Sequence, residues 1–297
     1  MNNSRKYLLP ILFFMAIGTI HAKDTTPIDS TVFVVGYNYH VNTKDADGAP
    51  VVDSLQTVLL VGHQYTKTMG YHSFWTTING ETQETFDAMA KEWQFHVPII
   101  LKNMAEEQMT VYEDIPVQHY VYEDDGTKEW EMLGDTLTVN GFLCNKAQTR
   151  YGGRTWTVWY AEEVASTAGP WKFHGLPGLI VKCSDDAGIF CFELFELVNK
   201  VFPITNDENN RSHPNKKITR EKFIERRNKL FLNPRYPSDP LYYHQSSEAD
   251  DKGYALWSLE KTPRNPDGSI SLLYLTRKIN GVAVPWKANE YQPLEIE

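Results

Sequence analysis

The sequence is poor in cysteine and lacks the short motifs that mark common catalytic and cofactor sites. It has 3 cysteines among 297 residues, none of them in a C-x-x-C pair. The G-x-S-x-G, H-E-x-x-H and phosphate-binding loop patterns are absent, so nothing local points to a serine hydrolase, a zinc protease or a nucleotide-binding enzyme. No two histidines after residue 22 lie two or four positions apart, which leaves a local metal-binding pair without support. We therefore expect no metal and no cofactor, and we favour a binding protein over an enzyme.

Long apolar runs are absent after the first 22 residues. The run from Tyr7 to Ile20 follows two basic residues and precedes the small residue Ala22, which predicts a secretory signal peptide over residues 1–22. It contains Pro10 and is short against the roughly 20 residues that a membrane span needs. No cysteine stands immediately after the cleavage point, so we expect no lipid anchor. The remaining residues 23–297 are expected to form one domain, periplasmic or secreted, with no transmembrane segment.

Positive charge is scarce as well. Lysine and arginine number 29 against 38 aspartates and glutamates, for a net charge of −9. Removal of Arg5 and Lys6 with the signal peptide takes this to −11, since −9 − 2 = −11. An acidic surface repels phosphate backbones and anionic lipid headgroups. Nucleic acid and nonspecific membrane adsorption are therefore poor candidates for partners.

Strand patterns dominate the first two thirds of the chain. Gly152-Gly153 suits a two-residue primed turn, and this register pairs Thr149 with Trp156 and Ala147 with Val158 on one face. Thr85–Gln94 is expected to be a short helix, because its apolar residues have helical spacing. Further strands are expected over Ser30–Val41, Ser54–Thr66, Ile99–Tyr112 and Pro116–Glu123.

The last third has a different character. Thr219 can cap a helix whose apolar stripe includes Phe223 and Ile224, and the basic residues around this stripe are expected to form a solvated outer face. Ser269–Asn280 is expected to be a last strand, followed by an extended tail. Because the strands carry apolar residues on both faces, the fold class is expected to be mainly β, or β-rich α+β. We expect a curved antiparallel sheet, or an open barrel-like one, with one helix in the C-terminal half and an irregular tail.

A corner rich in turn residues joins two of the expected strands. Leu176-Pro177-Gly178-Leu179 has the composition of a type II turn, which predicts a positive φ at Gly178. The corner would hold His174 in a set position. A hydrogen-bonded structural histidine beside Trp171 is the favoured interpretation, and a catalytic role is the alternative.

The same corner carries a resemblance to a known family. Its residues spell GLPGLI, and the chain resembles the GLPGLI family, a family of exported proteins of Bacteroidetes. The resemblance extends to Asn140–Ala147, to Gly153-Arg154 with Val158–Tyr160, and to Gly169–Phe173, and it departs at Glu163-Val164-Ala165, where an Ile-Pro pair is expected. It implies an exported β-rich protein and no particular activity. The residues that form this structural motif are Gly175, Leu176, Pro177, Gly178, Leu179 and Ile180.

Two cysteines flank a hairpin signal just beyond this corner. With a three-residue loop, Cys183 would lie opposite Cys191, and the two could form a disulfide or remain as small buried hydrophobes. Cys144 would then be a buried free thiol or the partner of one of them. Asp185-Asp186 and Asp124-Asp125 both lie in turn signals, so they are interpreted as turn-forming residues and not as an acid/base pair.

These observations leave two functional hypotheses. The first is an exported, non-enzymatic cell-envelope protein that binds an apolar ligand, a peptide or a partner protein, with an accessory role to an outer-membrane transporter as one form of it. The second is a periplasmic enzyme whose site joins His174 to carboxylates from distant parts of the chain.

Overall fold

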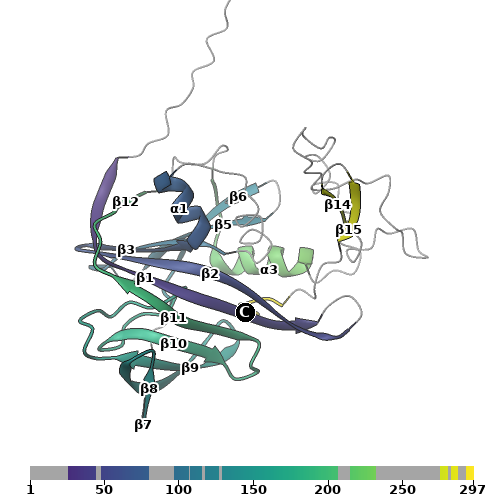
Figure 1. Cartoon of the computed structure of the whole chain (residues 1–297). Helices are drawn as coiled ribbons and strands as arrows, with labels where there is room; N and C mark the ends of the chain where they lie inside the picture. Colours follow the sequence, from purple (N-terminus) through teal and green to yellow (C-terminus); the bar gives the residue numbers. More distant parts are fainter. Residues whose placement is uncertain are drawn as a thin grey trace, which may run out of the picture.

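The structure is a computed structural model that describes residues 26–44, 48–79, 97–106, 108–115, 118–126, 129–206, 215–231, 275–279, 282–286 and 292–297. The expected signal peptide over residues 1–22 and the expected helix over Thr85–Gln94 lie outside these residues. Strands dominate the described part of the chain, and the expected mainly β class with a curved open sheet is confirmed (Figure 1).

One sheet of 13 strands forms the body of the protein. Its strands are β1 Pro27–Lys44, β2 Pro50–Gly62, β3 Tyr65–Gly70, β4 Ile99–Asn103, β5 Met109–Ile115, β6 Gln118–Asp124, β7 Glu131–Val139, β8 Phe142–Tyr151, β9 Arg154–Ala161, β10 Leu179–Asp185, β11 Phe190–Val198, β12 Pro203–Thr205 and β13 Lys216–Lys217. The helices are α1 Tyr71–Asn79 and α3 Arg220–Phe231, and a separate hairpin pairs β14 Leu275–Ile279 with β15 Val282–Trp286.

The strand order is β13-β6-β5-β4-β3-β2-β1-β11-β10-β9-β8-β7, with β12 paired to the start of β1. All neighbours are antiparallel except β13 and β6, so the sheet is mixed. The long strand β1 joins the two halves, because it pairs with β2 on one side and with β11 on the other. Strands β7 and β13 are the two edges of this order, so the sheet is open. In Figure 1, β8 to β11 lie below β1 to β3, which shows how strongly the sheet curls.

Aromatic and aliphatic side chains fill the space inside this curl. Tyr37 and Trp156 have no exposed surface, and Tyr39 stacks on Phe192 with ring centroids 4.2 Å apart. The hydroxyl of Tyr37 donates to the carbonyl oxygen of Ile180 at 2.7 Å, which satisfies a polar group that would otherwise be costly to bury. Leu176, Leu179 and Ile180 of the GLPGLI corner therefore form part of the core, while Gly175 and Pro177 are exposed.

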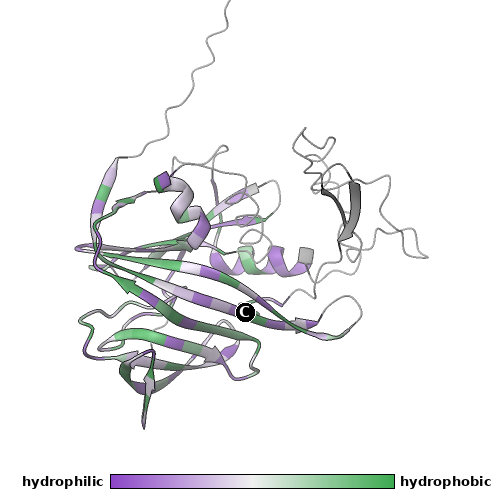
Figure 2. Ribbon diagram, in the orientation of Figure 1, coloured by the Kyte–Doolittle hydropathy of each residue, from purple (hydrophilic) through white to green (hydrophobic). Residues whose placement is uncertain are grey.

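A second apolar cluster lies on the other face of β1 and β2, where α1 covers the sheet. Phe74 of α1 packs there with Val34, Val58 and Leu60. Apolar residues on both faces of these central strands are what the sequence predicts, and Figure 2 shows hydrophobic and hydrophilic positions interspersed along them.

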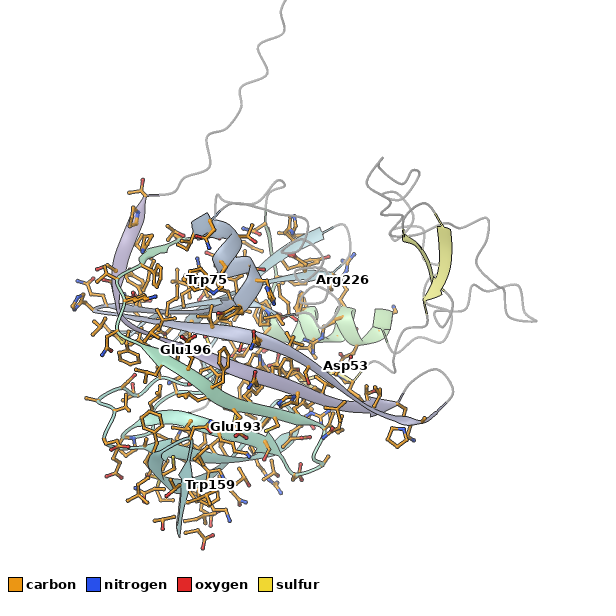
Figure 3. The ribbon with its side chains drawn as sticks, viewed as in Figure 1. Asp53, Trp75, Trp159, Glu193, Glu196 and Arg226 are labelled. Carbon is orange, nitrogen blue, oxygen red and sulfur yellow. The ribbon has the colours of Figure 1, made fainter. Side chains whose placement is uncertain are left out.

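The outer face of the other half of the sheet is polar. Glu193, Lys182, Trp159 and Lys146 lie opposite one another across β11, β10, β9 and β8, and Figure 3 labels Glu193 and Trp159. The ammonium group of Lys182 lies 2.7 Å from the carboxylate of Glu193, and that of Lys146 lies 5.6 Å from the ring centroid of Trp159. These groups satisfy one another at the surface.

The predicted β8–β9 hairpin is confirmed. Thr149 pairs with Trp156 and Ala147 with Val158, and Gly152 and Gly153 have φ of 61° and 76°. Two other strand predictions are wrong in extent. The strand predicted over Ser54–Thr66 is divided between β2 and β3, and the one predicted over Ile99–Tyr112 is divided between β4 and β5. Both breaks are short reversals between apolar segments, which periodicity alone does not separate.

Candidate functional site

The corner from Gly169 to Gly178 places a lysine in the core of the protein. Lys172 is 1% exposed, and its neighbours Trp171 and Phe173 are buried with it. Trp171 has a φ of 54°, a left-handed conformation that is uncommon for a bulky residue and costs about 1–3 kcal/mol. Strained residues of this kind are concentrated at functional sites, which makes the surroundings of Lys172 a candidate functional site.

Two carboxylates and a phenol surround the ammonium group of Lys172. Its Nζ donates to Asp124 Oδ2 at 2.9 Å, to Glu295 Oε2 at 2.8 Å and to the hydroxyl of Tyr122 at 3.1 Å. Asp124 ends β6, and Glu295 belongs to the segment that follows the β14–β15 hairpin. A buried charge is tolerated when it is paired and hydrogen-bonded in this way.

Two arginines of α3 complete the cluster. Arg220 donates to Glu295 Oε1 at 2.8 Å, and its Nε lies 3.0 Å from Asp124 Oδ2. Arg227 donates to Glu113 Oε1 at 3.1 Å and to the carbonyl oxygen of Glu295 at 2.9 Å. We call these six residues the buried ion cluster, and its three cations balance its three carboxylates: Lys172, Arg220 and Arg227 with Glu113, Asp124 and Glu295.

The cluster shifts the proton affinity of its own members. Burial raises the pKa of Glu295, but the charges of Lys172, Arg227 and Arg220 outweigh it and hold that pKa below its usual value. The pKa of Asp124 is lowered in the same way, because Lys172 outweighs the effect of burial. Burial dominates at Glu113 and raises its pKa, although Arg227 and Lys172 oppose the shift. Burial also raises the pKa of the tyrosines that line the cluster, Tyr122 and Tyr151.

Residues 292–297 lie along this cluster as an extended segment, and their backbone is hydrogen-bonded by the rest of the protein. The carbonyl oxygen of Pro293 accepts from Arg154 Nη2 at 2.8 Å. The amide of Ile296 donates to the carbonyl oxygen of Gly152 at 2.8 Å. The same Arg154 is fixed by Asp185, which accepts from its Nη1 at 2.9 Å. The segment is thus bound through main-chain contacts in addition to the side chain of Glu295.

The glycines of the β8–β9 turn make room for this segment. A Cβ atom on Gly152 would lie 2.9 Å from the side chain of Glu295, and one on Gly153 would lie 3.1 Å from Ile296. Both distances are shorter than ordinary van der Waals contact. These two glycines therefore serve the turn through their positive φ and the bound segment through their lack of a side chain.

Leu294 faces the apolar interior. It packs against the main core, and with Trp171 and Phe192 it lines a cavity of about 20 Å³. A second cavity of about 30 Å³ lies under α1, beside Phe74 and Trp75. Each has room for about one water molecule.

The motif residues follow Lys172 along the chain, but they do not adopt the predicted turn conformation. The prediction of a positive φ at Gly178 is wrong, because the left-handed glycine of the motif is Gly175, with a φ of 95°. Gly178 is needed for a different reason. A Cβ atom there would lie 2.4 Å from the carbonyl oxygen of Ala161 and 2.8 Å from Cα of Glu162. The glycine lets the corner pass directly over the end of β9.

His174 is held by backbone groups. Its Nε2 lies 3.2 Å from the carbonyl oxygen of Asp125, and its own carbonyl oxygen accepts from Trp130 Nε1 at 2.9 Å. Burial and the nearby charge of Lys102 lower its pKa. The catalytic alternative stays a prediction.

The predicted register of the cysteines is wrong. Ser184 pairs with Cys191, and Cys183 pairs with Phe192, so the two cysteines do not lie opposite each other. The loop contains one residue more than predicted, which moves Cys183 to the other face of the hairpin from Cys191. All three cysteines are free thiols in the structure, and burial raises the pKa of Cys144 to about 11.

The aspartate pairs hold turns and also pair with cations. Asp124 accepts from the amide of Gly126, and Asp185 accepts from the amide of Phe190, both at 2.7 Å. The expectation of turn-forming aspartates is therefore correct in part. It did not foresee their pairing with Lys172 and Arg154.

The expectation that the basic residues of α3 are solvated is wrong for two of them. Arg227 is 3% exposed, and Arg220 is partly buried against Glu295. The available signal was the lysine within Pro170-Trp171-Lys172-Phe173, because a charge among residues of a buried corner calls for a partner. No local pattern identified Glu295 as that partner.

Among the described residues, no group of three or more histidine, cysteine, aspartate or glutamate side chains is arranged to hold a metal ion. None of the described helices is long and apolar enough to cross a membrane.

Comparisons with known proteins give weak likenesses. No protein-family model matches the chain, and no curated protein matches it. Two crystal structures of PNGF-II, in space groups P21 and C2, align with TM-scores of 0.45 and 0.43 and identities of 12% and 13%. They cover 67% and 66% of this chain and 33% and 32% of the PNGF-II chains, so this chain spans about a third of their length.

A LolA superfamily protein from Nitrosomonas europaea aligns with a TM-score of 0.25 and 10% identity, over 59% of this chain and 90% of that one. Likenesses of this strength carry no argument about function, which rests on the site itself.

Proposed function

We propose that this chain is an exported, non-enzymatic protein of the cell envelope, of the GLPGLI type, that binds a partner polypeptide as an extended segment within its curved sheet. The observation that carries the proposal is the way residues 292–297 are held. The guanidinium of Arg154 and the carbonyl oxygen of Gly152 hydrogen-bond the backbone of this segment, while the side chain of Glu295 contacts Lys172 and Arg220 in the buried ion cluster. Proteins that recognise extended peptides use this combination, with backbone contacts for affinity and side-chain pockets for specificity.

The buried ion cluster supports recognition more than stability. Replacing a buried ion pair by well-packed apolar residues is often neutral or stabilising, so such pairs are weak evidence for a purely structural role. Their best-attested role is to specify one arrangement among several. In this protein the cluster specifies which side chain occupies the place of Glu295.

A small apolar ligand has less support. The two cavities, of about 30 and 20 Å³, are far below the roughly 300–1,000 Å³ of pockets that enclose small molecules. The extended segment 292–297, which the rest of the protein already binds, favours a polypeptide ligand. The export part of the proposal is supported by the charged and apolar pattern of residues 1–22 and by the resemblance at residues 175–180.

Binding of a free peptide tests the proposal. A labelled peptide with the sequence Gln-Pro-Leu-Glu-Ile-Glu is titrated into the chain that ends after residue 291, and fluorescence anisotropy gives the Kd. We expect this chain to bind the peptide, and the full-length chain to bind it more weakly because its own residues 292–297 compete. A scrambled peptide of the same composition is the control. If the shortened chain is folded by circular dichroism and binds neither peptide, the proposal is wrong.

A further inference from the structure

The side chains of residues 292–297 differ in how deeply the rest of the protein buries them. Pro293 is buried, and Leu294 packs against the core. Glu295 is 1% exposed, whereas Ile296 is 51% exposed. The protein therefore contacts the proline, the leucine and the glutamate closely, and it leaves the next residue largely in solvent.

Resting on the function proposed above, we propose that the ligand is an extended polypeptide segment in which a glutamate follows a leucine-sized apolar residue. The chain's own residues 292–297 occupy this site until such a segment displaces them. Lys172 and Arg220 bind the carboxylate of this glutamate, and the apolar residue packs into the interior beside Trp171.

The chemistry of the pocket requires a carboxylate. Both oxygens of Glu295 accept hydrogen bonds from Lys172, at 3.0 and 2.8 Å, and Oε1 also accepts from Arg220 at 2.8 Å. Lysine and arginine side chains can only donate. A glutamine keeps one acceptor oxygen, but its NH₂ group would replace the other and face a donor of Lys172 or Arg220 with no acceptor between them. An aspartate is one methylene shorter, so its carboxylate would not reach Lys172 while the amide of the next residue, Ile296, keeps its bond to Gly152.

Charge balance adds a second requirement. Without Glu295, the cations Lys172, Arg220 and Arg227 face only Glu113 and Asp124. An uncompensated buried charge is costly, so an empty pocket, or one filled by a neutral residue, is disfavoured. The protein therefore stays occupied by its own glutamate or exchanges it for that of a ligand.

Residues 292–297 are covalently joined to the rest of the chain, which makes it difficult for a free peptide to displace them. Sixty residues, 232–291, separate the end of α3 from Gln292. A tethered segment competes with an effective concentration on the order of millimolar, so a free peptide binds well only if the chain's own segment is weakened. A substitution that weakens the chain's own segment should therefore increase the binding of a free peptide.

The experiment uses the full chain with Glu295→Gln, which keeps the length and shape of the segment and removes its charge. The change Glu297→Gln is the matched control, because that side chain is exposed and Arg220 contacts only its carbonyl oxygen. Anisotropy is measured with three labelled peptides, which carry Glu, Gln or Asp at the fourth position of Gln-Pro-Leu-X-Ile-Glu. We expect the Glu295→Gln chain to bind the Glu peptide at least tenfold more tightly than the Glu297→Gln chain does. The Gln and Asp peptides are expected to bind about 10-fold to 100-fold more weakly than the Glu peptide.

A substitution of Arg220 tests which residues bind the carboxylate of the glutamate. In the Glu295→Gln background, Arg220→Gln is expected to reduce the preference for the Glu peptide about tenfold. Lys222→Gln, an exposed position on the same helix, is expected to leave it unchanged. If Arg220→Gln keeps the full preference, the assignment of the pocket is overturned.

The outcomes separate this inference from the proposed function. If the three peptides bind equally well, the site does not discriminate in favour of glutamate. This inference is then wrong, although the proposed peptide binding is still supported. If the folded Glu295→Gln chain and the chain ending after residue 291 bind none of the peptides, both fall. Sedimentation of the wild-type chain identifies the source of the segment. We assign it to a different polypeptide, because the chain's own segment already occupies its own site. A monomer at all concentrations agrees with this assignment, and a dimer that dissociates on addition of the Glu peptide overturns it.

Discussion

The balance of charge in the buried ion cluster predicts a large effect for the change Lys172→Met. The lysine side chain is fully buried, and its removal leaves Arg220 and Arg227 to face three carboxylates. Breaking a buried pair by removing one partner costs about 3–5 kcal/mol. For a domain of this size, that corresponds to a melting temperature lower by about 6–20 °C.

The second change Glu295→Gln restores neutrality, because two cations then face two carboxylates. We therefore expect the double variant to lose less stability than the sum of the two single variants, with an interaction of about 1–3 kcal/mol. Urea unfolding followed by circular dichroism gives the four free energies of unfolding that this cycle needs. The control is Lys182→Met. Lys182 lies 2.7 Å from Glu193 on the outer face, where both side chains are about one-third exposed, and exposed pairs contribute about 0.2–1 kcal/mol.

Two results would refute this reasoning. One is a loss of stability in Lys172→Met that is no larger than in Lys182→Met. The other is strict additivity in the double variant, which would mean that Lys172 and Glu295 do not depend on each other.

Three further predictions concern other parts of the protein. Gly178→Ala is expected to cost about 1–3 kcal/mol, because its Cβ would meet the backbone of residue 161, whereas Gly134→Ala, with no atom near its Cβ, is expected to change the melting temperature little; equal melting temperatures would contradict the close approach. The pKa of Glu295 is lowered from 4.5, so its contribution to stability is present above pH 4.5 and is lost as pH falls below it. In urea unfolding, the stability difference between the wild type and Glu295→Gln should accordingly shrink below pH 4.5. Mass spectrometry after alkylation of the unreduced, denatured protein should count three thiols, and in the native state Cys191 should react before the fully buried Cys183; a mass that indicates a disulfide would contradict the register of the hairpin.

The elements that sequence reasoning predicted well are those whose pattern is local. The β8–β9 hairpin has its turn signal in Gly152-Gly153 and its register follows from counting outward from that pair, so both were predicted correctly. The capped start of α3 was also correct, because Thr219 accepts from the amide of Lys222 one turn later.

What sequence reasoning missed depends on contacts between distant parts of the chain. Lys172 is 48 residues from Asp124 and 123 residues from Glu295, and no periodic pattern connects such positions. Gly178 was assigned to a turn because its neighbours are turn-forming, yet its role is set by the approach of residue 161 from another strand. The predicted pairing of Cys183 with Cys191 was wrong because the loop of the β10–β11 hairpin is one residue longer than predicted. A shift of one position moves every side chain of a strand to the other face.

The distance along the chain between Lys172 and Glu295 also bears on how the protein folds. The lysine and the glutamate that neutralises it are 123 positions apart, so the contact between them closes a very long loop. Contacts of such large separation slow folding, because the entropy of loop closure opposes them until late. The buried ion cluster is therefore expected to form late in folding, after the hairpins of the sheet have paired.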